Sequence, residues 1–194
     1  MNATIKRYLD FMVEIDKVKS IFRKSRIFDK SRYENDAEHS WTICVMAALF
    51  REFSPVSVNL ERVLLMLLLH DVVEIDAGDT FLYSSDREGA AERERKAAER
   101  IFGLLDDGHR DLFRGLWEEF EARETPEAKY AAVFDRLEPL YQNYVNEGST
   151  WKENGVSRDM VLAANRHIAE GAPEVWAFVE EVVEDAVRRG FLPP

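Results

Sequence analysis

Two histidines and two aspartates are the residues of this sequence best suited to chemistry. His39 lies near the start of a predicted helix, His70 and Asp71 are adjacent, and Asp135 stands in a later, apolar-rich segment. Imidazole nitrogens combined with carboxylate oxygens suit borderline or hard divalent cations, whereas a soft metal prefers thiolates. The set therefore predicts a site for one divalent metal ion, which leaves open Mn²⁺, Co²⁺, Fe²⁺, Zn²⁺, Ni²⁺ or Mg²⁺.

The spacing of these residues restricts where such an ion can lie. On a regular helix the side chains of His70 and Asp71 diverge by about 100°. Both reach one ion only if it lies beside the helix wall or near a frayed end. His39 falls in the first turn of its helix, where the helix dipole disfavours imidazolium and favours a neutral ligand. A third helix must supply another ligand, and Asp135 is the best candidate.

Each of these residues also has a purely structural interpretation. A buried histidine is more often a hydrogen-bonded core residue than a ligand, and a His-Asp pair occurs by chance in a fair fraction of chains of this length. Glu38 is explained fully as part of a capping box that begins at Asn35. We expect His109 to lie in a loop and His167 on a helix face. The residues alone leave metal binding and a structural role open.

Nearly every segment has the period of an amphipathic helix, and no segment alternates as a strand does. The segment at residues 59–73 is apolar on almost every face, which predicts a helix buried at the centre of the domain. We therefore expect a single all-α domain over residues 1–194, with seven to nine helices. The predicted helices are residues 5–22, 36–53, 59–73, 86–105, 111–123, 126–146, 157–170 and 175–186.

The composition limits the classes of partner. The 194 residues carry a net charge of −11, which argues against nucleic-acid polymers and anionic membrane surfaces, since both attract cationic proteins. A metal or a few local arginines can still attract a small anion. The longest apolar run, residues 63–69, is far shorter than the ~18 residues of a membrane span. No signal-peptide pattern is visible, and the single Cys44 suits a reducing compartment. We expect a cytoplasmic protein.

The order His39, His70-Asp71, Asp135 resembles the signature of the HD-domain metal-dependent phosphohydrolases. Longer blocks resemble the YfbR-like 5′-deoxynucleotidase branch of that superfamily, and the resemblance spans roughly residues 5–185. The second of these blocks is the most specific. The blocks are RYENDAEHSW at residues 32–41, HDVVEIDAGDT at 70–80, LWEEFE at 116–121 and FDRL at 134–137.

The resemblance implies an all-α HD-domain helical bundle and a role for each matching residue. The implied metal ligands are His39, His70, Asp71 and Asp135. Glu74 matches the catalytic acid, and its place one turn after His70 lets it stand beside the metal without binding it. Arg23 matches a phosphate contact, Asp79 matches a contact to the sugar hydroxyl, and Thr80 adjoins it. In part of the family a tryptophan that crowds out a ribose 2′-hydroxyl follows the arginine, whereas Lys24 and Ser25 follow here.

We therefore expect a metal-dependent enzyme that releases inorganic phosphate from deoxyribonucleoside or ribonucleoside 5′-monophosphates. Two alternatives stay open. One is another HD-type nucleotide hydrolase, either a triphosphohydrolase or a phosphodiesterase. The other is a nucleotide-binding regulatory scaffold without turnover. The resemblance also implies a homodimer, but no segment identifies its interface. The sequence leaves open the native metal, the preferred base, the choice between ribose and deoxyribose, and the pathway.

Overall fold

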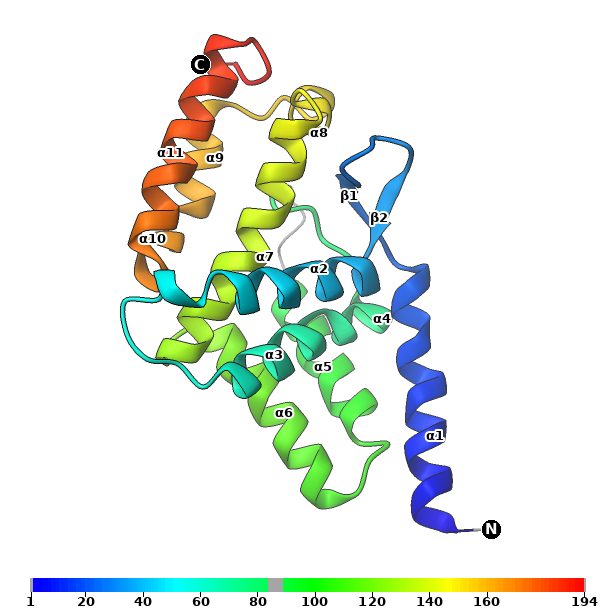
Figure 1. Ribbon diagram of the computed structural model, residues 1–194. Coiled ribbons are helices and arrows are strands. Elements are labelled where there is room, and N and C mark those ends of the chain that lie inside the picture. Colours follow the sequence, from blue (N-terminus) through cyan, green and yellow to red (C-terminus); the bar gives the residue numbers. More distant parts are fainter. Residues whose placement is uncertain (1, 84–88, 194) are drawn as a thin grey trace.

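The computed structural model describes residues 2–83 and 89–193. Helices dominate it, and one short hairpin stands at its edge (Figure 1). Of the eleven α-helical segments in these residues, eight contain at least eight residues, so the predicted all-α fold is confirmed. The segments are α1 (Ala3–Ile15), α2 (Asp36–Leu49), α3 (Leu60–Leu69), α4 (Glu74–Ala77), α5 (Ala90–Phe102), α6 (Asp107–Ala122), α7 (Pro126–Val145), α8 (Ser149–Glu153), α9 (Arg158–Asn165), α10 (Ile168–Gly171) and α11 (Pro173–Arg188).

Three helices, α2, α3 and α7, pack against one another at the centre. α5 and α6 lie on one side of them, and α9, α10 and α11 lie on the other side of α7 (Figure 1). The core side chains Ile43, Met66 and Val133 come from the three central helices and are fully buried. α2 and α7 carry His39 and Asp135, and His70 and Asp71 directly follow α3, so the site lies where the three central helices meet. None of the described helices is long and apolar enough to cross a membrane.

Side-chain caps begin the central helices where the sequence predicts them. Asn35 and Glu38 form the expected capping box at α2. Asn59 accepts a hydrogen bond from the Arg62 backbone N–H at α3, and Thr125 precedes a proline at the first position of α7. Each cap satisfies a backbone N–H group that has no partner within its helix. Hydrogen bonds within the first turns of α2 and α7 therefore stabilise these helix starts independently of tertiary contacts.

The predicted end of the central helix is wrong. α3 ends at Leu69, and the chain continues as a 3₁₀ turn, η3 (His70–Val73), before the short α4. A 3₁₀ turn is tighter than an α-helix and is common at helix ends. The predicted central place of this helix is confirmed, but its burial is incomplete, because the Leu68 side chain is 51% exposed. The unbroken apolar run conceals both features.

Two short strands also contradict the sequence prediction. β1 (Phe22–Arg26) pairs with antiparallel β2 (Tyr33–Asn35), in a stretch expected to be polar and without strands. The pairing is irregular between its two ends. Strands this short, with charged residues on both, give no alternating pattern. The hairpin nevertheless matters, because it carries Arg23 to the site.

Other helix boundaries shift for identifiable reasons. The predicted first helix ends at Ile15 and continues as η1 (Asp16–Ser20), and the helix from 36 ends at Leu49 before η2 (Arg51–Phe53). α6 begins at Asp107 rather than residue 111, because Asp106 caps it by accepting from the His109 backbone N–H. His109 therefore lies in a helix and not in a loop.

The remaining differences lie towards the C-terminal half. α5 begins at Ala90 and ends at Phe102, and the predicted start at Asp86 lies outside the described residues. The segment predicted as 157–170 divides into α9 and α10, with His167 at the turn between them. The five-residue α8 was not predicted, whereas α7 matches its prediction within one residue at each end.

Candidate active site

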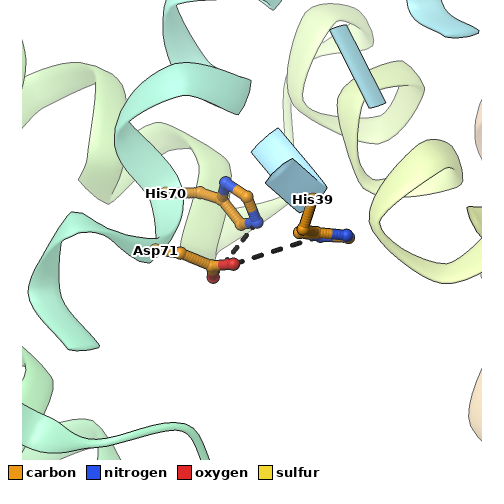
Figure 2. A group of neighbouring side chains, drawn as sticks. All are labelled: His39, His70 and Asp71. Atoms are coloured by element: carbon orange, nitrogen blue, oxygen red, sulfur yellow. Dashed lines mark ion pairs between the residues drawn. The ribbon is translucent and has the colours of Figure 1, made fainter. Parts of the chain in front are cut away.

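His39, His70, Asp71 and Asp135 converge on one point beside a cavity that the last three of them line. His39 Nε2 lies 3.3 Å from Asp135 Oδ1 and 4.0 Å from Asp71 Oδ2. His70 Nε2 lies 3.1 Å from Asp71 Oδ1 and 3.7 Å from Asp135 Oδ1. Figure 2 shows His39 approaching from α2 and His70 with Asp71 from η3. The structure therefore brings together two imidazoles and two carboxylates from three central segments.

The 3₁₀ turn explains how two adjacent residues face one point. Since η3 begins at His70, the His70 and Asp71 side chains leave the chain at the end of α3 and not along a helix wall. This is the second of the two geometries that the sequence left open, an ion near the helix end. The His70 Nδ1–H donates to the Leu67 carbonyl at 2.8 Å. That hydrogen bond turns Nε2 towards the carboxylates.

The donor set fits a divalent cation. His70 Nε2 is buried without a hydrogen-bond partner, and His39 Nε2 points at the same carboxylates. Potential ligand atoms of His39, His70 and Asp71 all lie within 4.8 Å of one another. A buried nitrogen without a partner is costly, and two imidazoles with two carboxylates suit Mn²⁺, Co²⁺, Fe²⁺, Ni²⁺ or Zn²⁺. A cation bound among them would satisfy His70 Nε2.

Charges within the cluster shift the pKa values of its members in opposite directions. Burial opposes the change at both residues of the His70–Asp71 pair but is outweighed. The carboxylates of Asp71 and Asp135 raise the pKa of His70 to about 10. His70 and Arg23 lower the pKa of Asp71 to about 2. The carboxylates of Asp71 and Asp135 therefore stabilise a nearby positive charge, either a proton on an imidazole or a metal ion.

Arg23 reaches the cluster from β1. Its side chain is mostly buried, and its Nη1 lies 2.7 Å from Asp71 Oδ2 and 3.6 Å from Asp36 Oδ1. Nη2 lies 3.9 Å from Asp135 Oδ1. Arg23 therefore occupies the cavity wall directly beside the predicted ligands, where its guanidinium can meet an anion.

Glu74, Asp79 and Thr80 line the same cavity, whose volume is about 220 Å³. Oxygens of Asp36, Glu74 and Asp79 lie within 4.8 Å of one another. Burial raises the pKa of Glu74 well above its ordinary value, and the charges of Asp71 and Asp36 raise it further. One buried oxygen of Glu74 has no hydrogen-bond partner. The carboxylate therefore stands next to the cluster with capacity to take up a proton.

Other residues that line the cavity have a different character. They combine aromatic rings with two arginines and a histidine, and they provide room for a molecule larger than phosphate. They include Phe81, Tyr83, Phe120, Arg123, Arg136, Trp151 and His167. Burial and the charges of Arg136 and Arg123 lower the pKa of His167 to about 4, so this histidine is neutral near pH 7.

Sequence reasoning missed three buried carboxyl groups next to the cluster. Asp36 stands three residues before His39, Glu138 stands three residues after Asp135, and Glu34 lies on β2. The pKa of Asp36 rises to about 7 through burial and the charge of Asp71, and that of Glu34 rises to about 8 through burial and Glu138. For Asp36 and Glu138 the spacing from the predicted ligands was the available signal, because residues three apart share a helix face, whereas Glu34 on its strand gave none.

Comparisons with known proteins decide the family. A family model described as "HD domain" matches residues 15–176. The chain belongs to the HD-domain family. This confirms the resemblance predicted from the motifs, and it places the convergent histidines and aspartates within the matched region.

Similar proteins include relatives with assigned names. The HD-domain chain is 30% identical to the zebrafish (Danio rerio) 5′-deoxynucleotidase HDDC2 over 184 residues, covering 93% of this chain and 88% of that protein. It is 27% identical to the human protein of the same name over 136 residues, covering 69% and 65% of the two chains.

Solved structures agree with the fold. A predicted metal-dependent phosphohydrolase from Magnetospirillum magnetotacticum MS-1 superposes with a TM-score of 0.95 at 47% identity, covering 99% of this chain and 97% of that one. An HD-domain phosphohydrolase from Listeria innocua gives a TM-score of 0.65 at 19% identity, covering 93% and 90% of the two chains. At that identity the second likeness concerns the fold alone.

Proposed function

We propose that this protein is a divalent-metal-dependent phosphohydrolase that releases inorganic phosphate from deoxyribonucleoside or ribonucleoside 5′-monophosphates. The hydrolase class predicted from the sequence is supported by the HD-domain family and by relatives named 5′-deoxynucleotidase. One structural observation carries the proposal. His70, Asp71, Asp135, Glu74 and Arg23 line one cavity, and His39 contacts Asp135 from behind its wall, so ligands, base and phosphate contact lie together.

The proposed metal ligands are His39, His70, Asp71 and Asp135, whose donor atoms face one another. When bound, a divalent cation supplies Lewis acidity towards a phosphoryl oxygen and makes a nearby water more acidic. The rest of the chemistry belongs to the protein's own side chains.

Glu74 is the proposed proton acceptor. It orients a water and takes its proton as the water oxygen attacks phosphorus in line with the leaving 5′-oxygen. The bond from phosphorus to that oxygen breaks, the leaving 5′-oxygen takes a proton from water, and Glu74 returns its own proton to solvent. The raised pKa of Glu74 makes its ionised carboxylate a stronger proton acceptor than an ordinary glutamate.

Arg23 is the proposed phosphate contact, because its guanidinium lines the cavity directly beside the proposed ligand Asp71. Charge-assisted hydrogen bonds from arginine stabilise phosphate oxygens as their charge changes. Asp79 and Thr80, which line the same cavity, are the proposed contacts to the sugar.

The test is phosphate release by metal-free protein supplied singly with Mn²⁺, Co²⁺, Fe²⁺, Zn²⁺, Ni²⁺ or Mg²⁺. The substrates are dAMP, AMP, dATP and a phosphodiester, and Asp71→Ala measures contaminating phosphatase. We expect metal-dependent release from dAMP that exceeds attack on dATP or the diester. Preference for either of those would favour the other hydrolase classes. Metal binding without release from any substrate would favour a regulatory scaffold.

We further infer from the family resemblance a cytoplasmic homodimer. An apolar stripe on α2 supports a second copy as the partner, since Trp41, Val45 and Leu49 follow one another at successive turns and are 68%, 41% and 70% exposed. Exposed apolar patches of this kind are typical of interfaces. Light scattering after gel filtration should show a dimer, and Leu49→Asp should give a folded monomer. A monomeric native protein at all concentrations tested would contradict the dimer.

A further inference from the structure

A layer of buried polar side chains lies behind His39, on the side away from Asp135. It consists of Glu34 from β2 with Glu138 and Gln142 from α7, and each is at most 2% exposed. His39 Nδ1 lies 3.1 Å from Glu138 Oε2 and 3.8 Å from Glu34 Oε2. The two ring nitrogens of His39 thus face two different carboxylate groups, one behind the ring and one in the site.

Hydrogen-bond chemistry assigns different roles to the two nitrogens. A carboxylate only accepts hydrogen bonds, so the 3.1 Å contact requires the Nδ1–H of His39 to donate to Glu138. In a neutral imidazole, Nε2 then carries a lone pair. That lone pair points towards Asp135 and Asp71, where the proposed cation binds.

Glu138 is itself held in place. The Gln142 amide, one turn further along α7, donates to Glu138 Oε1 and also donates to Glu34 Oε1 at 2.8 Å. Asp135 lies one turn before Glu138 on the same helix. One face of α7 therefore provides a proposed ligand, the acceptor behind His39 and the brace for that acceptor.

His70 provides an internal comparison. Its Nδ1–H donates to the backbone carbonyl of Leu67, so the helix end orients that ring regardless of side-chain chemistry. His39 has a side-chain acceptor in the equivalent place. The orientation of His39 therefore depends on one residue that mutation can change.

We propose that Glu138 is a positioning residue that holds His39 in its Nδ1–H form and presents Nε2 to the metal ion. This inference rests on the proposed function for the metal, and it gives Glu138 no contact with metal or substrate. Carboxylates that accept from metal-binding histidines commonly change metal affinity by about 10–100-fold when they are removed.

The test measures Mn²⁺ binding by calorimetry on the full chain after metal removal. Glu138→Ala should weaken Mn²⁺ binding and raise its dissociation constant by about 10–100-fold. Glu138→Gln retains an acceptor oxygen but loses the charge, so its affinity should fall between those of native protein and Glu138→Ala. This conservative variant also keeps the test measurable if Glu138→Ala does not fold.

Tyr130→Phe is the matched control. The Tyr130 hydroxyl is buried and donates to the Ala47 carbonyl at 2.9 Å, which also joins α7 to α2. Its removal should lower the melting temperature and leave Mn²⁺ affinity within twofold of native. The comparison separates general loosening of the α2–α7 contact from loss of ligand orientation.

Three results would overturn the positioning role. The first two are native Mn²⁺ affinity in folded Glu138→Ala and native Mn²⁺ affinity in Glu138→Gln. The third is complete loss of Mn²⁺ binding in Glu138→Ala, which would make Glu138 a ligand. The proposed function fails separately. Native protein that binds Mn²⁺ but releases no phosphate from any nucleotide contradicts the enzyme, whereas a fully active enzyme with unchanged affinity in Glu138→Ala contradicts only the positioning role.

Discussion

The two walls of the cavity are built differently. The wall with His70, Asp71 and Asp135 comes from η3 and α7 and is contacted by His39 of α2, and both imidazoles are at most 5% exposed. The adjoining wall comes from a short hairpin and from the segment after α4, where Asp79 and Thr80 are only partly buried. The proposed metal ligands are thus part of the protein core, whereas the proposed substrate contacts lie on short elements. Changes to the first wall should abolish metal binding, and changes to the second should alter substrate use.

The largest expected effect is on the core wall. Asp71→Ala removes a proposed ligand and the 2.7 Å partner of Arg23, so we expect no Mn²⁺ binding and phosphate release at background. Asp76→Ala is the control, because Asp76 lies five residues later and pairs with Arg100 at the surface. Metal content by elemental analysis and phosphate release measure both. Native metal content and turnover in Asp71→Ala would show that the ligand set is wrong.

Substitutions of Glu74 test whether metal binding and phosphate release can be separated. If Glu74 accepts a proton without binding metal, Glu74→Gln should keep the metal and lose about 10²–10⁴-fold in single-turnover phosphate release. Glu74→Ala should behave similarly. Reduced stability with near-normal turnover would instead mean that Glu74 only supports the turn after α3.

A smaller effect is expected from the hairpin wall. Arg23→Gln removes a charged hydrogen bond to phosphate, worth about 1.5–3 kcal/mol, so kcat/KM should fall about 10–100-fold. Arg26→Gln is the control on the same strand, since Arg26 contacts Tyr33 and Glu153 and does not line the cavity. Equal losses in the two variants would assign the effect to the hairpin's stability.

The last prediction concerns pH, and each single pH unit should change affinity less than the substitutions do. In metal-free protein the pKa of His70 is about 10, because the carboxylates of Asp71 and Asp135 outweigh burial. The imidazole is therefore protonated at neutral pH and must release its proton to bind a metal. Mn²⁺ affinity should rise about tenfold per pH unit from pH 6 to 8 for each proton released. Calorimetry in buffers of different ionisation enthalpy measures the proton, and pH-independent affinity would contradict the assignment.

Sequence reasoning worked where local chemistry decides structure. Asn35, Asn59 and Thr125 mark the starts of the three central helices because a cap acts within its own first turn. The spacing also identified the four convergent residues. The start of one predicted helix, the end of a second and part of a third had to meet at one ion. The family resemblance additionally assigned Arg23 to the phosphate, and for Glu74 it agreed with a position already indicated by its place one turn after His70.

The remainder depends on tertiary contacts. The β1–β2 hairpin forms on polar strands that pack against α7 and η1, and its sequence carries no alternation. Helix period predicts an α-helix through His70, whereas the fold closes that turn as 3₁₀. Glu138 resembles any helical glutamate in the sequence, and only the packing of α2 against α7 places it behind His39.

The central claim is that a divalent metal binds among His39, His70, Asp71 and Asp135. Anomalous X-ray diffraction from a crystal of the Mn²⁺-loaded protein tests it most directly. The strongest anomalous peak should lie about 2.0–2.4 Å from one nitrogen or oxygen of each of the four side chains. A strongest peak at Asp36, Glu74 and Asp79, or between Glu34 and Glu138, would contradict the account.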